Sequence, residues 1–276
     1  MRMTWFITPH HRPQDTWNVL ANFERQSTRV FLVVVENGAA IGSFPKHLPY
    51  TRVLRSSPGV TNALNVGLEY VKQHAHEHDW FCKVDSDDWY GAEYAVYATQ
   101  HKCAATVQLD TLLRNKASRL WLVQPQHGAP VLPGPTLAGL VSTAPYFPPR
   151  LYGEGQAWLA DLTKQGLPVQ HLRAGHFCHM RSTGGQHTAD NDDDEFLMSD
   201  HVVSDLGMFS PSFLDVVRAP YSVQRSVVPS IPFDLTRTLQ WRELPSNFRD
   251  ALPPETVNEI SLHMRASPAP PYQGDT

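Results

Sequence analysis

The apolar residues of this chain fall into short runs that alternate with amphipathic segments through the first hundred positions. Short apolar runs bounded by charged or turn-forming residues are typical of strands in a sheet that is buried on both faces. Segments in which apolar residues recur every three or four positions are typical of helices packed on such a sheet. Strands are therefore predicted at residues 3–7, 29–35, 51–54 and 80–84, and helices at residues 13–23 and 61–76, with another starting near Trp89.

This alternation predicts βαβ units around a mostly parallel, Rossmann-like α/β sheet flanked by helices. Beyond residue 102 the pattern loosens: residues 124–149 are rich in Pro and Gly and contain one apolar run at 136–141. A helix at 156–165, ended by Gly166 and Pro168, and a strand at 169–172 follow. We expect a ligand-binding half at 1–105, a second half of the same domain at 106–210, and a C-terminal extension at 211–276 with a helix near 254–264 and a disordered tail.

Polar residues occur where the predicted strands end. Arg12, Glu36, the Ser56-Ser57 pair and the aspartates after residue 84 all follow apolar runs. In open α/β sheets the carboxyl ends of the strands form the edge at which ligands bind. These residues predict a charged, nucleotide-like ligand accompanied by a metal ion, with ordinary turn and cap chemistry as the alternative.

The most acidic of these strand ends reads D-W-F-C-K-V-D-S-D-D-W-Y from Asp79 to Tyr90. If the chain stays extended past Val84, Asp85 and Asp87 lie on the same side, because side chains alternate along a strand. Paired carboxylates favour a hard cation such as Mg²⁺ or Mn²⁺. In the alternative interpretation, Asp87 or Asp88 merely caps the helix predicted to start near Trp89.

Composition narrows the class of protein further. The net charge of −4 argues against a protein that holds nucleic acid by its phosphates, although it is compatible with a local basic groove. No window is long and apolar enough for a membrane span, and the first residues lack a signal-length apolar core. The three cysteines lack metal-knuckle or disulfide-framework spacing, which favours a reducing cytoplasm. The histidines at 74, 76 and 78 are interpreted as a solvated face.

The order of these motifs resembles the nucleotide-sugar-binding half of inverting family 2 glycosyltransferases with the GT-A fold. The resemblance rests on T-P (8–9) with Arg12, on Glu36, on N-A-L-N-V-G (62–67) and on W-F-C-K-V-D-S-D-D-W (80–89), which contains a D-x-D. It implies a nucleotide-sugar site and a bound Mn²⁺ or Mg²⁺ ion. The implied nucleotide-sugar ligands are Thr8, Pro9, Arg12, Glu36, Asn62, Asn65, Lys83, Asp85 and Ser86. The implied metal ligands are Asp87 and a late histidine, either His179 or His187.

A downstream segment, G-E-G-Q-A-W-L (153–159), resembles the part of that family that supplies the catalytic base. The second acid of the family motif is replaced here by Gly155, and the motif arginine is absent. Either Glu154 takes the place of the base, or an acid of the run that contains Asp192, Asp193 and Asp194 does.

The resemblance therefore implies a metal-dependent transferase that moves a sugar, with inversion, from a nucleoside-diphosphate donor, expected to be a UDP-sugar. The acceptor stays open between a glycan, a protein, a small molecule and a modified nucleic-acid base. Two alternatives also stay open: a nucleotidyltransferase, which usually has a Gly-rich loop where this chain has T-P-H-H-R-P, and a non-catalytic module that binds nucleotide sugars.

Overall fold

A seven-stranded sheet forms the centre of the computed structural model, which describes residues 2–38, 50–109, 111–114, 120–124, 134–150, 153–173, 177–180 and 201–203. All neighbouring pairs in this sheet are parallel except those of β9, which is antiparallel to β4 and β6. In sheet order the strands are β10 (Val169–Leu172), β6 (Ala105–Gln108), β9 (Ala138–Leu140), β4 (Trp80–Lys83), β1 (Thr4–His10), β2 (Val30–Asn37) and β3 (Thr51–Ser56). The predicted α/β class with a mostly parallel sheet is confirmed.

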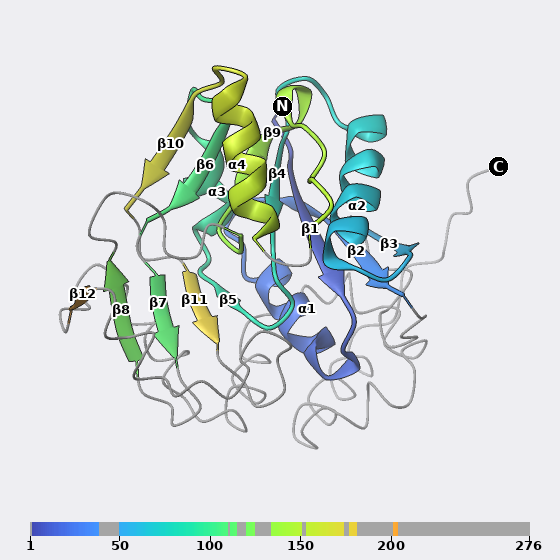
Figure 1. The fold of residues 1–276 in the computed structure, drawn as a ribbon. Coiled ribbons are helices and arrows are strands. Elements are labelled where there is room, and N and C mark those ends of the chain that lie inside the picture. The colour runs from blue at the N-terminus through green and yellow to red at the C-terminus, as the bar shows by residue number, and fades with distance from the viewer. Residues whose placement is uncertain are drawn as a thin grey trace.

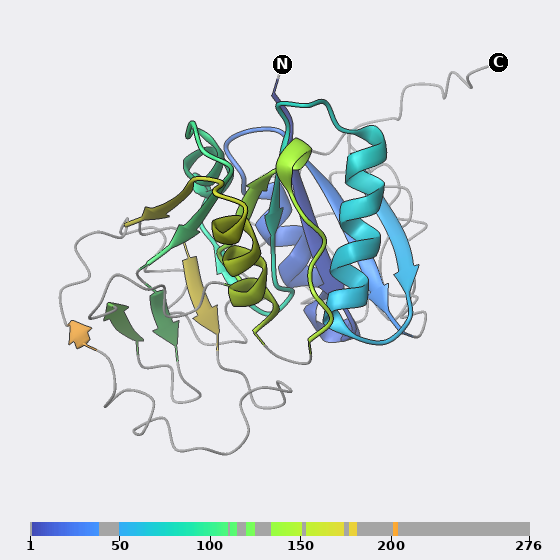
Figure 2. The ribbon, with the colours of Figure 1, turned by 45° about the horizontal axis from the view of Figure 1, so that its top comes forward.

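Helices cover both faces of this sheet (Figures 1 and 2). On one face α2 (Val60–His74) and α4 (Glu154–Lys164) pack against Ile7, Val33 and Phe81 through residues such as Leu64 and Trp158. On the other face α1 (Thr16–Glu24) and α3 (Tyr94–Thr99) pack against alternate residues of the same strands. Because both faces are buried, the central strands need apolar residues at successive positions, and the run at 31–35 meets that need.

The close packing of α2 on the sheet depends on one glycine. A Cβ atom at Gly67 would lie 2.5 Å from Cγ2 of Ile7 and 3.2 Å from Cγ2 of Val35. Both neighbours are branched side chains inside strands, which have little room to move. Any larger residue at this position would push the helix away from the sheet.

A second, five-stranded sheet lies beyond the carboxyl ends of β6 and β10 (Figure 1). In order it contains β12 (His201–Val203), β8 (Leu120–Gln124), β7 (Thr111–Arg114), β11 (Phe177–Met180) and β5 (Trp89–Tyr90). β5 pairs with β11 in antiparallel register, Tyr90 opposite Phe177. This sheet therefore begins directly after the acidic segment that follows β4.

The structure differs from the elements predicted from the sequence at three places. The helix expected near Trp89 begins only at Tyr94, because Trp89 and Tyr90 are buried as strand residues, at 1% and 0% exposure. The first strand continues through His10, so Thr8 and Pro9 belong to the strand and not to the loop after it. β9 forms inside the segment predicted to be mainly loop, where its three residues fill the gap between β4 and β6.

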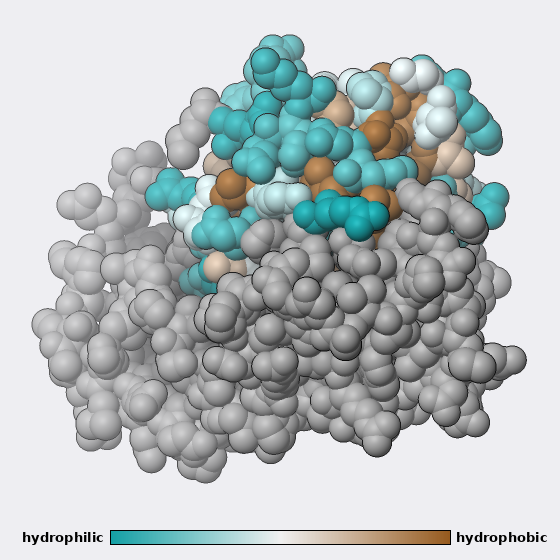
Figure 3. Space-filling model, turned by 90° about the vertical axis from the view of Figure 1, so that its left-hand side faces the viewer, coloured by the Kyte–Doolittle hydropathy of each residue, from teal (hydrophilic) through white to brown (hydrophobic). Residues whose placement is uncertain are grey.

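In the part of the left-hand face that the structure describes, polar residues outnumber apolar ones, and apolar residues lie between them (Figure 3). Among the described residues, the exposed large hydrophobic side chains are Tyr50, Val96 and Tyr146. The described helices include none with the length and hydropathy of a membrane span. The three cysteines are free thiols, as their spacing predicted. The expected C-terminal helix and tail lie outside the described residues.

Candidate functional site: an acidic cluster at the strand ends

The carboxyl ends of β1, β2, β3 and β4 meet at the same edge of the sheet, because these strands are parallel neighbours. In the register, Ile7 lies opposite both Val33 and Lys83, and His10 lies opposite Glu36. β1 and β2 therefore extend further in the carboxyl direction than β4, which ends opposite Ile7. The loop that follows β4 packs in the space left beside the end of β1.

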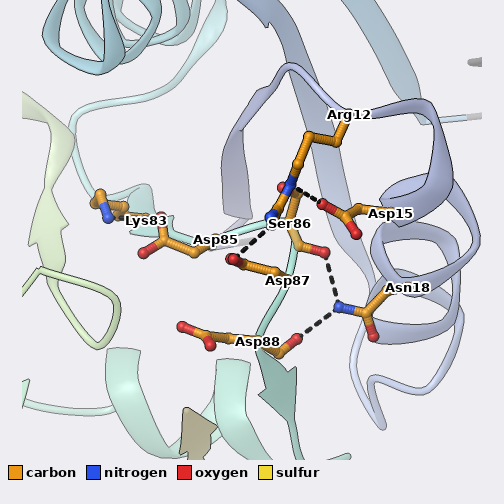
Figure 4. Close-up of polar contacts among 8 residues, drawn as sticks. All are labelled: Arg12, Asp15, Asn18, Lys83, Asp85, Ser86, Asp87 and Asp88. Carbon is orange, nitrogen blue, oxygen red and sulfur yellow. Dashed lines mark hydrogen bonds and ion pairs between the residues drawn. The ribbon is translucent and has the colours of Figure 1, made fainter. Parts of the chain in front are cut away.

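That loop turns and does not stay extended. The chain forms a turn at Ser86 and Asp87, and the amide of Asp88 donates to the carbonyl of Asp85 at 3.5 Å. The expected alternation along an extended strand is thus wrong, and the carboxylates of Asp85 and Asp87 face different cationic partners (Figure 4). Helix capping is also excluded, since α3 begins at Tyr94 after Glu93.

Two asparagines of α1 hold the acidic loop in place. Nδ2 of Asn18 donates to the carbonyls of Ser86 and Asp88, each at 2.8 Å (Figure 4). Nδ2 of Asn22 donates to the same Asp88 carbonyl at 2.7 Å, and its Oδ1 accepts from the amide of Tyr90 at 3.0 Å. Both asparagines are buried, so these bonds fix the loop in a region from which water is largely excluded.

Arg12 lies on one side of the loop. Its Nη2 is 2.5 Å from Oδ2 of Asp87, and its Nε is 2.6 Å from Oδ2 of Asp15. Burial lowers the pKa of Arg12, but Asp87 and Asp15 outweigh it and the pKa is raised. The guanidinium is therefore a permanent positive charge at this position.

Lys83 lies on the other side, where its Nζ is 2.6 Å from Oδ1 of Asp85 and 3.5 Å from Oε1 of Glu154. Glu154 is the first residue of α4, and the backbone enters this helix through Gly153 in a left-handed conformation, at φ 71°. A residue with a side chain would be strained there, so Gly153 sets the direction from which Glu154 approaches the strand ends. Glu154 lies on the aspartate side of the sheet edge and not in bulk solvent, with its side chain 15% exposed.

The cluster carries more negative than positive charge. Asp15, Asp85, Asp87, Asp88 and Glu154 are its five carboxylates, and Arg12 and Lys83 are its two cations. Burial raises the pKa of Asp85 against the attraction of Lys83, and the charges of Asp87 and Glu154 raise it further. Burial likewise raises the pKa of Asp15 to about 6, against the opposing pull of Arg12. A cationic ligand would relieve this excess.

The donor set fits a divalent cation that shares its coordination with a ligand. One oxygen of Asp85 is taken by Lys83 and one of Asp87 by Arg12, and the side chains are still 27% and 30% exposed. Within the described part of the chain, no three His, Cys, Asp or Glu side chains are grouped to hold a metal on their own. Mg²⁺ and Mn²⁺ sites of phosphate-transferring enzymes commonly use one or two carboxylates, with substrate oxygens completing the shell.

Some predicted ligands have structural partners of their own. Glu36 is buried, at 2% exposure, and its carboxylate accepts a hydrogen bond from Nε of Arg55 at 3.0 Å. Asn65 both donates to and accepts from the backbone of Phe147, and Nδ2 of Asn62 donates to the carbonyl of Pro58. Thr8 and Pro9 are buried in β1. None of these contacts tests nucleotide-sugar binding, which stays a prediction for these residues.

His179 lies in β11, where its backbone is opposite Leu113 of β7, while His187 and Asp193 lie outside the described residues. The sequence interpretation missed Asp15, Asn18 and Asn22. The spacing of Asn18 and Asn22 was an available signal: two amides four residues apart share a face of a helix that is otherwise largely apolar. No comparable helical spacing marked Asp15, because its partner Arg12 lies before the helix and not on one of its faces.

No protein-family model and no curated protein matches this chain. Solved structures with a similar arrangement include 4-diphosphocytidyl-2C-methyl-D-erythritol synthase, with a TM-score of 0.44 and 13% identity over 63% of this chain and 89% of the other. A protein of Desulfovibrio desulfuricans G20, described as a nucleotide-diphospho-sugar transferase, has a TM-score of 0.41 and 11% identity over 66% and 83%. The glycosyltransferase GlyE of Streptococcus pneumoniae TIGR4 has a TM-score of 0.34 and 8% identity over 61% and 44%. Likenesses this distant carry no conclusion about the activity of this chain.

Proposed function

We propose that this protein is a metal-dependent glycosyltransferase that moves a sugar from a nucleoside-diphosphate donor, expected to be a UDP-sugar, to an acceptor hydroxyl with inversion. The observation that carries the proposal is the pairing of Lys83 with both Asp85 and Glu154, beside the pairing of Arg12 with Asp87, at the carboxyl edge of a parallel sheet. A binding module would need only charges that complement its ligand. This site also has a further carboxylate, Glu154, which contacts the same lysine as Asp85 and can act as a base.

The residues divide the chemistry between them. Asp87 would hold the Mn²⁺ or Mg²⁺ ion, which would supply positive charge to neutralise the leaving diphosphate, and Asp85 would contact the donor. Glu154 accepts the proton of the acceptor hydroxyl while the acceptor oxygen forms its bond to the anomeric carbon. The bond from that carbon to the diphosphate oxygen breaks with its electron pair on the oxygen, and the nucleoside diphosphate leaves. Asn18 and Asn22 hold the backbone of the acidic loop through this step.

The proposal is tested by incubating the protein with a panel of nucleotide sugars, with Mn²⁺ or with EDTA, and measuring the nucleoside diphosphate released. We expect slow Mn²⁺-dependent donor hydrolysis without an acceptor, and none from Asp87→Ala, which removes the proposed metal ligand. The same variant should lose the Mn²⁺-dependent part of donor binding in a thermal-shift assay, whereas Asp85→Asn should mainly weaken donor binding.

Two other outcomes would assign a different function to the protein. Pyrophosphate release from a nucleoside triphosphate and a sugar phosphate would identify a nucleotidyltransferase. Tight donor binding with no turnover for any acceptor hydroxyl would identify a non-catalytic module. Wild-type metal-dependent binding in Asp87→Ala would place the cation elsewhere.

A further inference from the structure

Arg12 contacts two carboxylates whose surroundings differ. Its Nε contacts Asp15, whose side chain is 7% exposed at the start of α1, and its Nη2 contacts Asp87, whose side chain is 30% exposed. One end of the guanidinium thus contacts a buried carboxylate, and the other end contacts a partly exposed one (Figure 4).

This geometry places Arg12 in competition with the proposed metal. Nη2 of Arg12 lies 2.5 Å from Oδ2 of Asp87, the residue proposed to hold the divalent cation. Two positive charges around one carboxylate repel each other strongly in a partly buried site. A cation can take both oxygens of Asp87 only after the Nη end of Arg12 moves away.

The donor offers that end a new partner. A diphosphate presents closely spaced anionic oxygens, which match the fork of N–H groups of a guanidinium. The guanidinium is planar and moves as one unit, so a swing of the Arg12 side chain that carries Nη2 from Asp87 towards the diphosphate also turns Nε, while the charge stays close to Asp15.

We propose that Arg12 is the exchangeable counterion of Asp87. Without ligand it neutralises Asp87; when the divalent cation takes Asp87, Nη2 of Arg12 turns to the diphosphate of the donor. This inference rests on the proposed function and adds one property to it. The metal displaces Arg12 from Asp87 and frees it to contact the diphosphate, and the diphosphate in turn holds Arg12 away from Asp87. Each ligand therefore strengthens the binding of the other through Arg12.

The experiment measures Mn²⁺ binding by the loss of the free-ion EPR signal, with and without UDP, corrected for the Mn²⁺ that free UDP binds. For the wild type we expect weak binding of Mn²⁺ alone, tightened by UDP within the range of about 5- to 150-fold that is usual for coupled sites. For Arg12→Met we expect Mn²⁺ alone to bind about tenfold more tightly, as for the loss of a partly buried competing charge. UDP should then tighten Mn²⁺ binding by about tenfold less than in the wild type, because the coupling through Arg12 is gone and only the contact between the diphosphate and the ion remains.

Two variants complete the design. Arg52→Met removes the same charge from the exposed start of β3 and should leave both Mn²⁺ affinities at the wild-type values. The double variant Arg12→Met/Asp15→Asn also removes the carboxylate that Arg12→Met leaves unpaired, so it should repeat the Mn²⁺ result if the single variant folds poorly.

Unchanged Mn²⁺ affinity in both Arg12 variants, or full UDP coupling in either, would overturn the exchange. Absence of Mn²⁺ binding in every variant, with or without UDP, would overturn the exchange and the proposed metal site together. The expected coupling in a protein that cleaves no nucleotide sugar would support the exchange and overturn only the proposed transferase activity.

Discussion

The ammonium nitrogen of Lys83 lies 3.5 Å from Oε1 of Glu154, and this contact joins the last residue of β4 to the first residue of α4. Since Lys83 also lies 2.6 Å from Asp85, one buried cation links the end of the D-x-D strand to the helix that carries the proposed base. The resemblance assigned Lys83 to the nucleotide sugar. In the structure Lys83 also has a structural role, because it holds the carboxylates of Asp85 and Glu154 near each other.

Lys83→Met tests that role through stability. Burial lowers the pKa of Lys83, but Asp85 and Glu154 outweigh it and raise the pKa, so the folded protein holds a charged ammonium. Its removal leaves two partly buried carboxylates without their cation. We expect a loss of about 2–4 kcal/mol in the free energy of unfolding, somewhat below the full cost of breaking a buried pair because Asp85 is 27% exposed.

The matched control for this variant is Lys164→Met. Lys164 is 3.5 Å from Asp161, but its side chain is 78% exposed, so the loss should stay under about 0.5 kcal/mol. Urea denaturation of the three proteins measures both values. Equal stability of Lys83→Met and the wild type would show that Lys83 does not hold the site together.

The second prediction concerns the nucleotide edge at the end of β2. Glu36 is expected to accept hydrogen bonds from the base or ribose of the donor, and its carboxylate lies beside Nε of Arg55 at 3.0 Å. Glu36→Ala should raise the donor KM with little change in kcat, because contacts made equally in the ground and transition states affect binding alone. Initial-rate kinetics with varied donor would show this, and a defect confined to kcat would place Glu36 in the chemistry.

The parts of the fold that the sequence predicted are those with strong local patterns. β1 to β4, α1, α2, α4 and β10 all carry apolar runs or helical periodicity long enough to read without a partner. The miss at Trp89 has a physical reason: two aromatic residues after three aspartates have no local preference strong enough to define a strand, and β5 forms only because β11 pairs with it.

The candidate site divides in the same way. Aspartates at a strand end could be found from the sequence, because parallel strands bring their carboxyl ends to one edge. The partner of Asp87 could not, because Arg12 lies 75 residues away in the chain. The contacts of Lys83 with Glu154 and of Asn18 with Ser86 likewise join residues far apart in the sequence. The sequence therefore predicted an acidic edge, and only the fold shows how its charges are paired.

The third prediction concerns pH and stability. Burial, with the charges of His11 and Arg12, lowers the pKa of His10 from 6.5 to about 4. As the pH falls from about 6.5 to about 4, the unfolded chain therefore binds a proton that the folded protein does not, and His10 makes the protein less stable. Asp15 acts in the opposite direction: its pKa is raised from 3.8 to about 6, so the folded protein binds the proton first and gains stability as the pH falls through that window.

Variants separate the two contributions. His10→Gln keeps an amide near Oγ1 of Thr16, which lies 3.0 Å from Nε2 of His10, and removes the titration. Between pH 6.5 and pH 4 it should gain stability over the wild type by up to about 3 kcal/mol, whereas Asp15→Asn should lose a similar amount relative to the wild type. Urea midpoints at a series of pH values measure the differences. Curves that stay parallel to the wild type would contradict both assignments.

The last prediction concerns the base. Glu154 approaches the aspartate edge from the start of α4, and its side chain is 15% exposed. Gln keeps the size of the side chain and removes its ability to take a proton. Glu154→Gln should keep Mn²⁺ and donor binding and cut kcat by about 10²–10⁴, the usual contribution of a positioned base. The changes Asp192→Asn, Asp193→Asn and Asp194→Asn, in the other candidate acids, should be nearly silent in the same assay. A large kcat loss in one of these three, with Glu154→Gln unaffected, would move the base to that acid, and a raised donor KM with normal kcat in Glu154→Gln would make Glu154 a binding residue instead.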